Sequence, residues 1–256
     1  MFLTQRQLEI IDLAKLHGRV LVEDLASRFA VSPQTIRKDL NDLCDRQMLN
    51  RIHGGATFPS GTENMQYEAR RQIAAQEKQA IGLAAAQLIP NNTSLFINIG
   101  TTTEAVGEAL TDHSEMMAIT NNINVANRLR ILPSIEVSIA GGVVRGSDGG
   151  IVGEAAVDFI RQFKVDFAVI GASAIDADGA LLDFDFREVK VAQAIIANAR
   201  HVILVADSTK FERTAPVRIA QITQVDTFIT DKCPIPSLHR ICAENNVALI
   251  ETNPTP

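Results

Sequence analysis

The N-terminal part of the chain places apolar residues with the period of short helices. Residues 4–17 and 23–29 show this spacing, and the pattern resumes in residues 33–45. Ser32 and Pro33 are favoured at the N-cap and at the first position of a helix, so the third segment has a well-defined start. The pattern therefore predicts a short helix, a tight turn and a second helix, which is the plan of a helix-turn-helix.

In this motif the opening residues of the second helix face base edges in the major groove of DNA. Gln34 and Thr35 suit contacts with bases, whereas Arg37 and Lys38 suit phosphate or guanine. Residues 49–56 read as a strand, a Gly-Gly turn and a return strand, which predicts a wing. The predicted DNA-binding residues are Ser32, Gln34, Thr35, Arg37, Lys38, Asn41, Arg51 and His53.

Beyond a Pro/Gly/Ser/Thr/Asn cluster at residues 57–64, a helical pattern covers residues 67–86 and short apolar runs then alternate with helical segments. This alternation predicts a mostly parallel sheet flanked by helices. We therefore expect a winged helix-turn-helix domain, a linker with a connecting helix, and an α/β domain, over residues 1–58, 59–75 and 76–256. Strands are expected at residues 94–99, 117–120, 137–140, 165–170, 201–206, 227–229 and 247–250.

Polar and glycine residues follow several of these strands. Gly100–Thr103 joins a strand to a helix, where N–H groups and hydroxyls favour an anion. Thr120–Asn122 and Gly141–Gly142 follow two more strands, and Lys210 or Arg145 could pair with a phosphate. Because ligands bind outside the carboxyl ends of parallel strands, we expect a pocket for a phosphorylated polyol there. Its predicted residues are Gly100, Thr101, Thr102, Thr103, Thr120, Asn121, Asn122, Gly141, Gly142, Arg145, Asp176, Asp178, Glu188, Lys190 and Lys210.

Each of these groups, taken alone, also has a purely structural explanation. A Gly-Thr-Thr sequence after a strand is often only a turn, and acidic pairs such as Asp176 and Asp178 usually cap turns. The net charge of -6 also opposes DNA binding, although its distribution is uneven. Residues 1–60 carry 8 Lys and Arg against 7 Asp and Glu, a net +1, whereas the remainder carries 16 against 23, a net -7. Any nucleic-acid surface is therefore expected in the N-terminal part.

Composition excludes several other classes. A hydrophobic fraction of 46% with 21% charged residues is typical of a soluble globular protein. No apolar run reaches the ~18 residues of a membrane span, and the N-terminus lacks the pattern of a signal peptide. Cys44, Cys233 and Cys242 have no CxxC spacing, so neither a disulfide framework nor a zinc site is expected. We expect a cytoplasmic protein without metal or cofactor.

Residues 31–43 and 51–56 together closely resemble the N-terminal signature of the DeoR family of bacterial regulators. The polar strand ends resemble that family's sensor domain, which looks like the fold of ribose-5-phosphate isomerase. The resemblance runs from about residue 4 to 232. It implies a transcriptional repressor of a carbohydrate or glycerol catabolic operon, released from DNA by a sugar or polyol phosphate. A narrower resemblance within this family is carried by stretches such as Ile97–Thr102 and Asp148–Glu154. It implies that the effector is glycerol 3-phosphate.

The isomerase-like domain raises an enzymatic alternative. Glu188 and Lys190 have the chemistry of a general base and an enediolate-stabilising group. The isomerase loop, however, resembles Asp-Gly-Ala-Asp-Glu, from which the sequence around Asp176 and Asp178 departs, and an isomerase has no use for a DNA-binding domain. A pure interaction scaffold is disfavoured because polar residues concentrate at strand ends. We therefore expect a non-enzymatic repressor, acting as a homo-oligomer on operator repeats. The sequence does not distinguish a dimer from a tetramer. It also leaves open whether the protein can activate transcription and whether its effector is another sugar phosphate.

Overall fold

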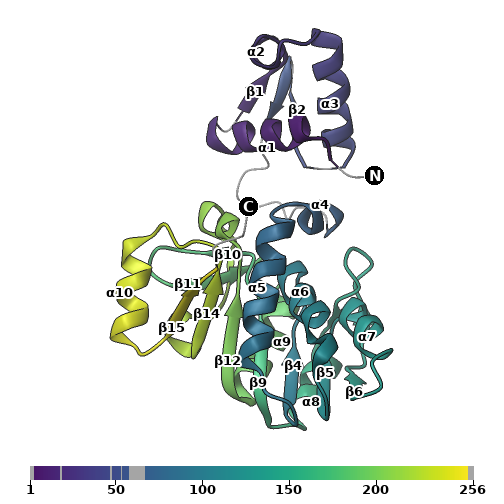
Figure 1. The fold of residues 1–256 in the computed structure, drawn as a ribbon, viewed down its shortest axis with the longest axis vertical. Helices are drawn as coiled ribbons and strands as arrows, with labels where there is room; N and C mark the ends of the chain where they lie inside the picture. The colour runs from purple at the N-terminus through teal and green to yellow at the C-terminus, as the bar shows by residue number, and fades with distance from the viewer. Residues whose placement is uncertain (1–2, 18, 47, 53, 58–66, 253–256) are drawn as a thin grey trace. The chain divides into compact units, whose positions relative to one another are not determined.

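The computed structural model describes residues 3–252 apart from 18, 47, 53 and 58–66, and divides into compact units at residues 1–73 and 74–256 (Figure 1). In the described residues, the helices are too short or too polar to cross a lipid bilayer. The expected linker over residues 59–75 falls partly outside the described residues, and its remainder holds a short helix, α4 (Tyr67–Gln72).

The N-terminal unit combines three helices with a small antiparallel sheet in the order β1-β3-β2. The predicted helix-turn-helix and wing are confirmed. The elements are α1 (Gln5–His17), β1 (Arg19–Leu21), α2 (Val22–Phe29), α3 (Pro33–Asp45), β2 (Asn50–Ile52) and β3 (Gly55–Thr57).

Local chemistry sets the turn between α2 and α3. Ala30 ends α2 in the left-handed region at φ 51°, and Ser32 caps α3 by accepting the Thr35 N–H at 3.2 Å. The buried face of α3 carries Ile36, Leu40 and Leu43. Polar bonds from α1 hold the same helix: Arg6 pairs with Asp39 at 2.6 Å, and Gln7 donates to Asp42 at 2.8 Å. Packing and these bonds together fix how α3 presents its exposed side.

The C-terminal unit is built on a seven-stranded sheet in the order β15-β14-β12-β9-β4-β5-β6, and every pair in it is parallel. Its strands are β4 (Ser94–Ile97), β5 (Met116–Thr120), β6 (Ile135–Ile139), β9 (Val165–Ile170), β12 (Ala199–Val205), β14 (Thr227–Thr230) and β15 (Ala248–Glu251). The principal helices are α5 (Ala75–Leu88), α6 (Thr101–Ala109), α7 (Ile123–Leu129), α8 (Glu154–Ile160), α9 (Phe186–Ala197) and α10 (Pro236–Glu244).

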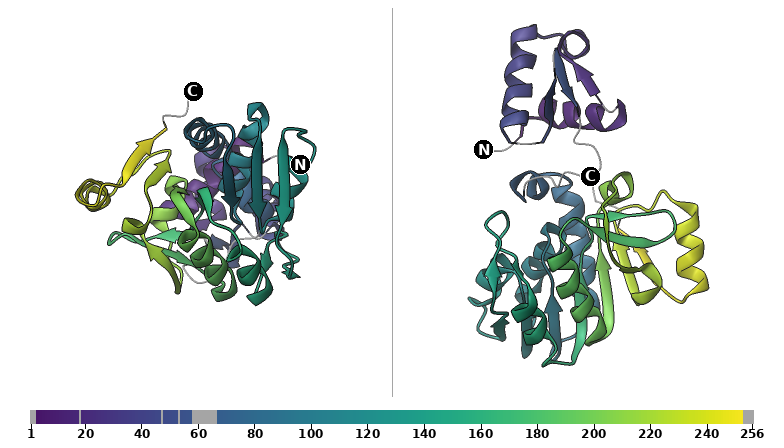
Figure 2. Two further views of the ribbon diagram at one scale, coloured as in Figure 1. Left: turned by 90° about the horizontal axis from the view of Figure 1, so that it is seen from below. Right: turned by 180° about the vertical axis from the view of Figure 1, so that it is seen from behind.

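The apolar side chains of β4 point alternately to the two faces of the sheet, which explains why helices cover both faces (Figure 2). Leu95 and Ile97 belong to the apolar cluster that includes α5, α6 and α7, whereas Phe96 belongs to the cluster that includes α8 and α9. Successive side chains of a strand point to opposite faces, so a strand buried on both faces is apolar throughout. The predicted α/β fold class is confirmed.

The strand order reverses at β4. From β4 the chain passes to β5 and β6 on one side, while β9, β12, β14 and β15 extend the sheet on the other. The carboxyl ends of β4 and β9 therefore flank a topological switch point, the usual place for a ligand in an open parallel sheet.

Two features differ from the sequence-based expectation. The single helix expected over residues 67–86 is wrong, because Ala74 adopts φ 52° between α4 and α5. The pattern also missed short antiparallel pairings that connect the main strands. They involve β7 (Val143–Val144), β8 (Ile151–Val152), β10 (Ala174–Ile175), β11 (Ala180–Asp183) and β13 (Val217–Gln221).

Candidate functional site

Helix α3 exposes a polar stripe opposite its buried face. Gln34, Arg37, Lys38 and Asn41 are exposed, at a spacing that brings them onto one side of the helix. Arg37 lies 3.7 Å from Glu23 of α2, and both side chains are largely open to solvent. This surface offers amide, guanidinium and ammonium donors together, which suits the floor and walls of the major groove.

The other predicted DNA contacts occupy different surroundings. Ser32 and Thr35 bond to each other at 2.9 Å between hydroxyl oxygens, so both are engaged in capping α3. Arg51 is exposed on the wing strand β2. His53 lies outside the described residues.

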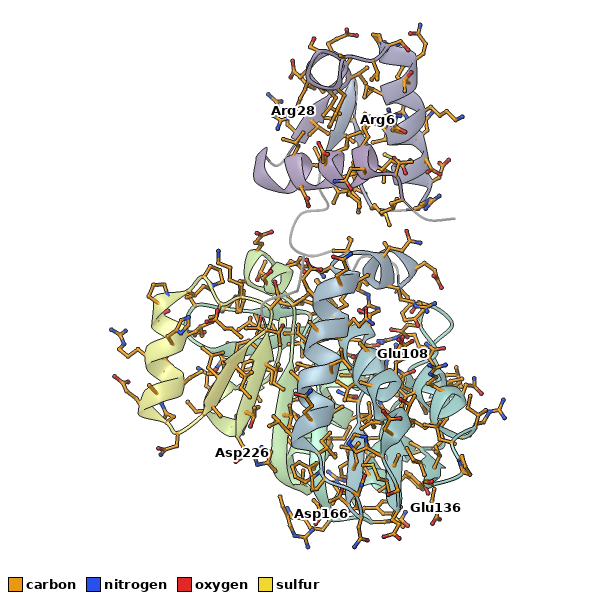
Figure 3. The ribbon with its side chains drawn as sticks, in the orientation of Figure 1. Arg6, Arg28, Glu108, Glu136, Asp166 and Asp226 are labelled. Atoms are coloured by element: carbon orange, nitrogen blue, oxygen red, sulfur yellow. The ribbon has the colours of Figure 1, made fainter. Side chains whose placement is uncertain are left out.

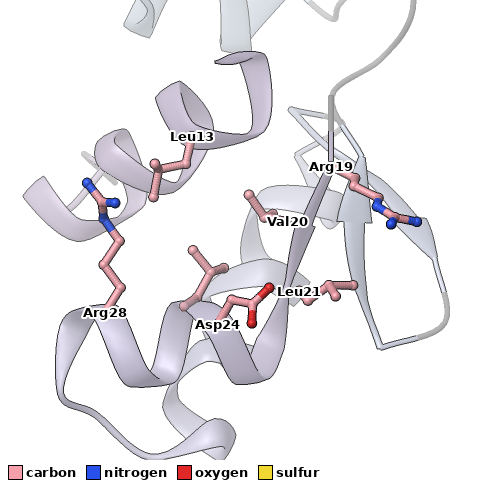
Figure 4. Close-up of a pocket in the computed structure, with 7 residues that line it drawn as sticks. Leu13, Arg19, Val20, Leu21, Asp24 and Arg28 are labelled. Carbon is pink, nitrogen blue, oxygen red and sulfur yellow. The ribbon is translucent and has the colours of Figure 1, made fainter. Parts of the chain in front are cut away.

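A groove of about 350 Å³ also opens in this unit, between α1, β1 and α2 (Figure 4). Its lining contains none of the predicted DNA-binding residues, so it is separate from the exposed stripe of α3. The residues around it are Leu13, Arg19, Val20, Leu21, Asp24, Leu25 and Arg28.

In the C-terminal unit, buried amides lie at the carboxyl ends of the central strands. Asn98 follows β4 and Asn121 follows β5, and their side chains are 2% and 0% exposed. The Asn121 amide nitrogen donates to the Ile151 carbonyl at 3.0 Å. The side-chain oxygens of Asn98 and Asn121 have no hydrogen-bond partner in the described structure. Buried polar atoms without partners are rare, and these two are acceptors that a ligand hydroxyl could satisfy.

Two threonines expected to bind a ligand are engaged within the protein instead. The Thr103 hydroxyl donates to the Asn98 carbonyl at 2.7 Å and is close to the Gly100 carbonyl. The Thr120 hydroxyl donates to the Ile97 carbonyl at 2.6 Å and accepts from the Asn122 N–H. Both hydroxyls thus shape the strand ends, and the structure does not favour them as ligand contacts.

The start of α6 remains open to an anion. Gly100 is its N-cap at φ 147° and supplies no side-chain cap. The first N–H groups of a helix have no partners within the helix, and the helix dipole adds positive potential there. Asn122 of the next strand end, in contrast, caps its own helix by accepting the Asn124 N–H and donates to Glu104.

A buried charged cluster follows β12. Asp207 is fully buried, and its Oδ2 lies 3.8 Å from the Lys210 ammonium and 3.9 Å from the Lys78 ammonium. Lys78 and Lys210 are only 4% and 7% exposed. Both ammonium groups therefore lie in a poorly solvated place, where they attract an anion more strongly than they would at the exposed surface.

Sequence reasoning found Lys210 but missed Lys78. The notable signal was its position on the apolar side of α5, three residues before Ile81 and seven before Ala85, which are both fully buried. A lysine in line with core residues at helical spacing is directed inward, although its type suggests solvent.

Arg145 was expected to contact a phosphate, and the structure gives it other partners. Its guanidinium donates to Glu188 at 2.5 Å, to Asp148 at 2.7 Å and to Asp185 at 3.2 Å. These contacts with three carboxylates link the loop of residues 145–150 to the start of α9. This arrangement does not favour the predicted phosphate role.

Among these carboxylates, Glu188 has an unusually high pKa. Burial, together with the negative charge of Asp183, raises its pKa to about 8 despite the Arg145 guanidinium. A raised pKa means that the folded protein holds a proton which the unfolded chain releases near pH 4.5. The stability that this proton contributes is present below that pH and is lost as pH rises towards 8.

We therefore expect Glu188→Gln to flatten the fall in stability between pH 5 and 8, since glutamine stays uncharged. The slopes of unfolding free energy against pH should differ between the two proteins by at most about 1.4 kcal/mol per pH unit. Urea unfolding at several pH values measures it, with Glu136→Gln at an exposed position as the control. Parallel curves for wild type and Glu188→Gln would contradict this account of Glu188.

The remaining predicted effector residues are not gathered with the buried cluster. Asp178 accepts the Ala180 N–H at 2.9 Å in the turn between β10 and β11, so the turn-capping alternative describes it, and Asp176 begins the same turn. Lys190 is exposed and pairs with Glu154 at 2.9 Å between α8 and α9. Gly141 and Gly142 are exposed after β6.

The opposite, amino-terminal edge of the sheet has a different chemistry. Asp166 accepts from the Ser94 N–H and hydroxyl, and Asp226 accepts from the Val202 N–H at 2.7 Å (Figure 3). The hydrogen bonds from Ser94 lower the pKa of Asp166. Carboxylates thus cap strand starts at one edge, while buried lysines lie at the other. The anion-attracting side of the sheet is therefore its carboxyl edge.

Comparison with known proteins agrees with this division. Residues 6–62 match the model of the DeoR-like helix-turn-helix domain, and residues 73–232 match the DeoR C terminal sensor domain. The chain is 46% identical to the glycerol-3-phosphate regulon repressor of Escherichia coli (strain K12), over 96% of this chain and 98% of that protein. It is 48% identical to the repressor of the same name from Haemophilus influenzae, over 90% and 89% of the two chains.

Among solved structures, ribose 5-phosphate isomerase A from Neisseria gonorrhoeae matches with a TM-score of 0.39 and 13% identity, over 59% of this chain and 55% of that one. The sequence relatives are named as repressors rather than enzymes. Both parts of the chain match models of a single family, in the order and at the positions where the structure places a winged helix-turn-helix and a parallel α/β unit. The chain therefore belongs to the DeoR family of helix-turn-helix transcriptional regulators.

Proposed function

We propose that this protein is a cytoplasmic transcriptional repressor that binds operator DNA through α3 and the wing, and leaves it when glycerol 3-phosphate binds the C-terminal unit. The observations that carry the effector half are the buried lysines Lys78 and Lys210 and the start of α6, which has no side-chain cap. A phosphate would engage these cations. The unsatisfied oxygens of Asn98 and Asn121 would accept hydrogen bonds from hydroxyls.

The likeness to the two glycerol-3-phosphate regulon repressors supports this choice of effector. The regulator would act as a homo-oligomer, because a two-fold assembly presents α3 to both halves of an operator. Release requires only that glycerol 3-phosphate binds more tightly to an arrangement that does not fit DNA. The coupling free energy can be no larger than the difference between the ligand's binding free energies for the two arrangements.

Thermal unfolding of the purified protein tests the effector half. At ~100 times its dissociation constant, a ligand adds about 2.7 kcal/mol to the stability of the folded state. We expect glycerol 3-phosphate to raise the melting temperature and glycerol to leave it unchanged. A shift with a different sugar phosphate instead would replace the effector within the same function. No shift with any phosphate would contradict the effector half.

Arg37→Ala tests the DNA half. Loss of a guanidinium that contacts phosphate or guanine should cost about 1–3 kcal/mol of binding free energy, which is about 5- to 150-fold in affinity. The operator is a duplex selected by the protein from randomised DNA, and fluorescence anisotropy measures binding. Arg28→Ala, exposed on α2, is the matched control. The melting shift with glycerol 3-phosphate should be the same in both variants. Equal operator affinity for both would contradict the assignment of α3.

A further inference from the structure

Asn98 and Asn121 occupy matching positions beyond the ends of two neighbouring strands. β4 and β5 are parallel partners in which Phe96 lies opposite Ile119, and both of these residues belong to the apolar cluster on the side of α8 and α9. Residues two apart on a strand share a face, and the asparagines come two residues after Phe96 and Ile119. Asn98 and Asn121 therefore lie side by side on that face of the sheet.

Each of these asparagines has one unsatisfied oxygen atom. Their side chains are 2% and 0% exposed, and neither Oδ1 has a hydrogen-bond partner in the described part of the chain. The amide of Asn121 has a defined orientation, because its nitrogen donates to the Ile151 carbonyl at 3.0 Å. A buried acceptor without a donor destabilises a fold, so two of them at adjacent strand ends indicate a function other than packing.

The loop of residues 145–151 packs directly against both strand ends. The Ile151 N–H donates to the Asn121 carbonyl at 2.7 Å, so the loop is bonded to the residue that follows β5. Beyond β4, a Cβ atom added at Gly150 would lie 2.6 Å from Ile99 Cδ1, which shows how closely the loop approaches the residue after Asn98. The two acceptors are thus shielded from solvent, and a donor bound there would form a hydrogen bond in a poorly hydrated place.

The chemistry of the site defines the kind of molecule that would satisfy it. The two oxygens accept hydrogen bonds, so the ligand must supply two donors. The start of α6, two residues after Asn98, has no side-chain cap and favours an anion. A phosphate ester with hydroxyls on two adjacent carbons supplies the anion and both donors. A carbonyl at either carbon would place an acceptor against an acceptor.

We propose that Asn98 and Asn121 are the specificity-determining residues of the effector site, each accepting a hydrogen bond from a different hydroxyl of a phosphorylated vicinal diol. The protein therefore distinguishes such a phosphate from its deoxy and carbonyl counterparts, although all of them carry the same anion. This inference rests on the proposed effector function and names the class of ligand that the site selects.

Two analogues of glycerol 3-phosphate test the wild-type protein. The analogue 2-hydroxypropyl phosphate lacks the terminal hydroxyl, and 3-hydroxypropyl phosphate lacks the middle one. Each should bind about 5- to 150-fold more weakly than glycerol 3-phosphate, because one buried acceptor then has no donor. Isothermal titration calorimetry measures the three dissociation constants, and 2-hydroxypropyl phosphate is used in the configuration that matches glycerol 3-phosphate.

Asn98→Leu and Asn121→Leu assign the hydroxyls, since leucine has a similar size and no acceptor. Each variant should bind glycerol 3-phosphate more weakly and lose its discrimination against one analogue while keeping it against the other. The analogue concerned should differ between the two variants. Asn127→Leu, exposed on α7, is the control and should discriminate as the wild type does.

Ligand-free stability separates this role from a structural one. Asn98→Leu should melt no lower than the wild type, because it removes a buried acceptor that has no partner. Wild-type protein that binds both analogues as tightly as glycerol 3-phosphate, or variants that both keep full discrimination, would overturn the inference and leave the effector function intact. A wild-type protein that binds none of the three phosphates would instead remove the proposed function itself.

Discussion

Gly55→Val should abolish operator binding and leave effector binding intact. A Cβ atom added at Gly55 would lie 2.0 Å from the Val20 carbonyl oxygen, where β3 pairs with β1. The obstacle is backbone, so no side chain can turn aside, and the sheet of the N-terminal unit must shift. Overpacking of this kind costs about 1–3 kcal/mol of stability, occasionally more. A displaced sheet also moves the wing, and the loss of about 3 kcal/mol of binding free energy already lowers operator affinity about a hundred-fold.

The control for Gly55→Val is Gly146→Val, where an added Cβ meets nothing within 4 Å. Operator binding is measured by anisotropy, and effector binding by the melting shift with glycerol 3-phosphate. The two variants should differ only in the first measurement. Operator binding by Gly55→Val at wild-type affinity would show that the pairing of β1 with β3 does not determine the DNA-binding surface.

Asp207→Ala should destabilise the C-terminal unit by about 3–5 kcal/mol, the usual cost of removing one partner from a buried ion pair. The substitution leaves Lys78 and Lys210 charged, buried and without the carboxylate that lies between them. Urea unfolding followed by circular dichroism measures the loss. Glu136→Ala, exposed on β6, should cost less than about 0.5 kcal/mol.

The pH dependence of the same site follows from its charges. Burial opposes the ionisation of Asp207, but the ammonium groups of Lys210 and Lys78 outweigh burial and lower its pKa. A lowered pKa contributes stability that is present above the ordinary pKa of 3.8 and is lost as pH falls below it.

Glycerol 3-phosphate should partly restore the stability of Asp207→Ala by supplying the missing negative charge. A variant as stable as the wild type would contradict the buried ion-pair account.

Local signals in the sequence were sufficient for the recognition helix and the main strands. Ser32 and Pro33 define the start of α3 by cap chemistry, and the run Ala168–Ile170 is apolar because both its faces are buried. These features depend on neighbours in the chain. The break at Ala74 has no such signal, since alanine favours helices and its left-handed conformation is imposed by the surrounding structure.

The candidate site was harder to predict because its chemistry depends on distant pairings. Arg145 has the right type for a phosphate, yet its partners Asp185 and Glu188 lie about forty residues away along the chain. Lys78 was not among the predicted site residues because its carboxylate partner, Asp207, is brought beside it only by the folded sheet. Sequence patterns placed the candidate site at the carboxyl edge of the sheet, but did not show which of its side chains remain available to a ligand.

Release of operator DNA by glycerol 3-phosphate tests the central claim most directly. Wild-type protein on its selected, labelled duplex is titrated with glycerol 3-phosphate, glycerol and sodium sulfate at matched ionic strength, since salt alone weakens protein–DNA binding. The account predicts that glycerol 3-phosphate releases the duplex over the concentration range that raises the melting temperature, while glycerol and sulfate do not. A protein stabilised by glycerol 3-phosphate that stays on its operator throughout would contradict it.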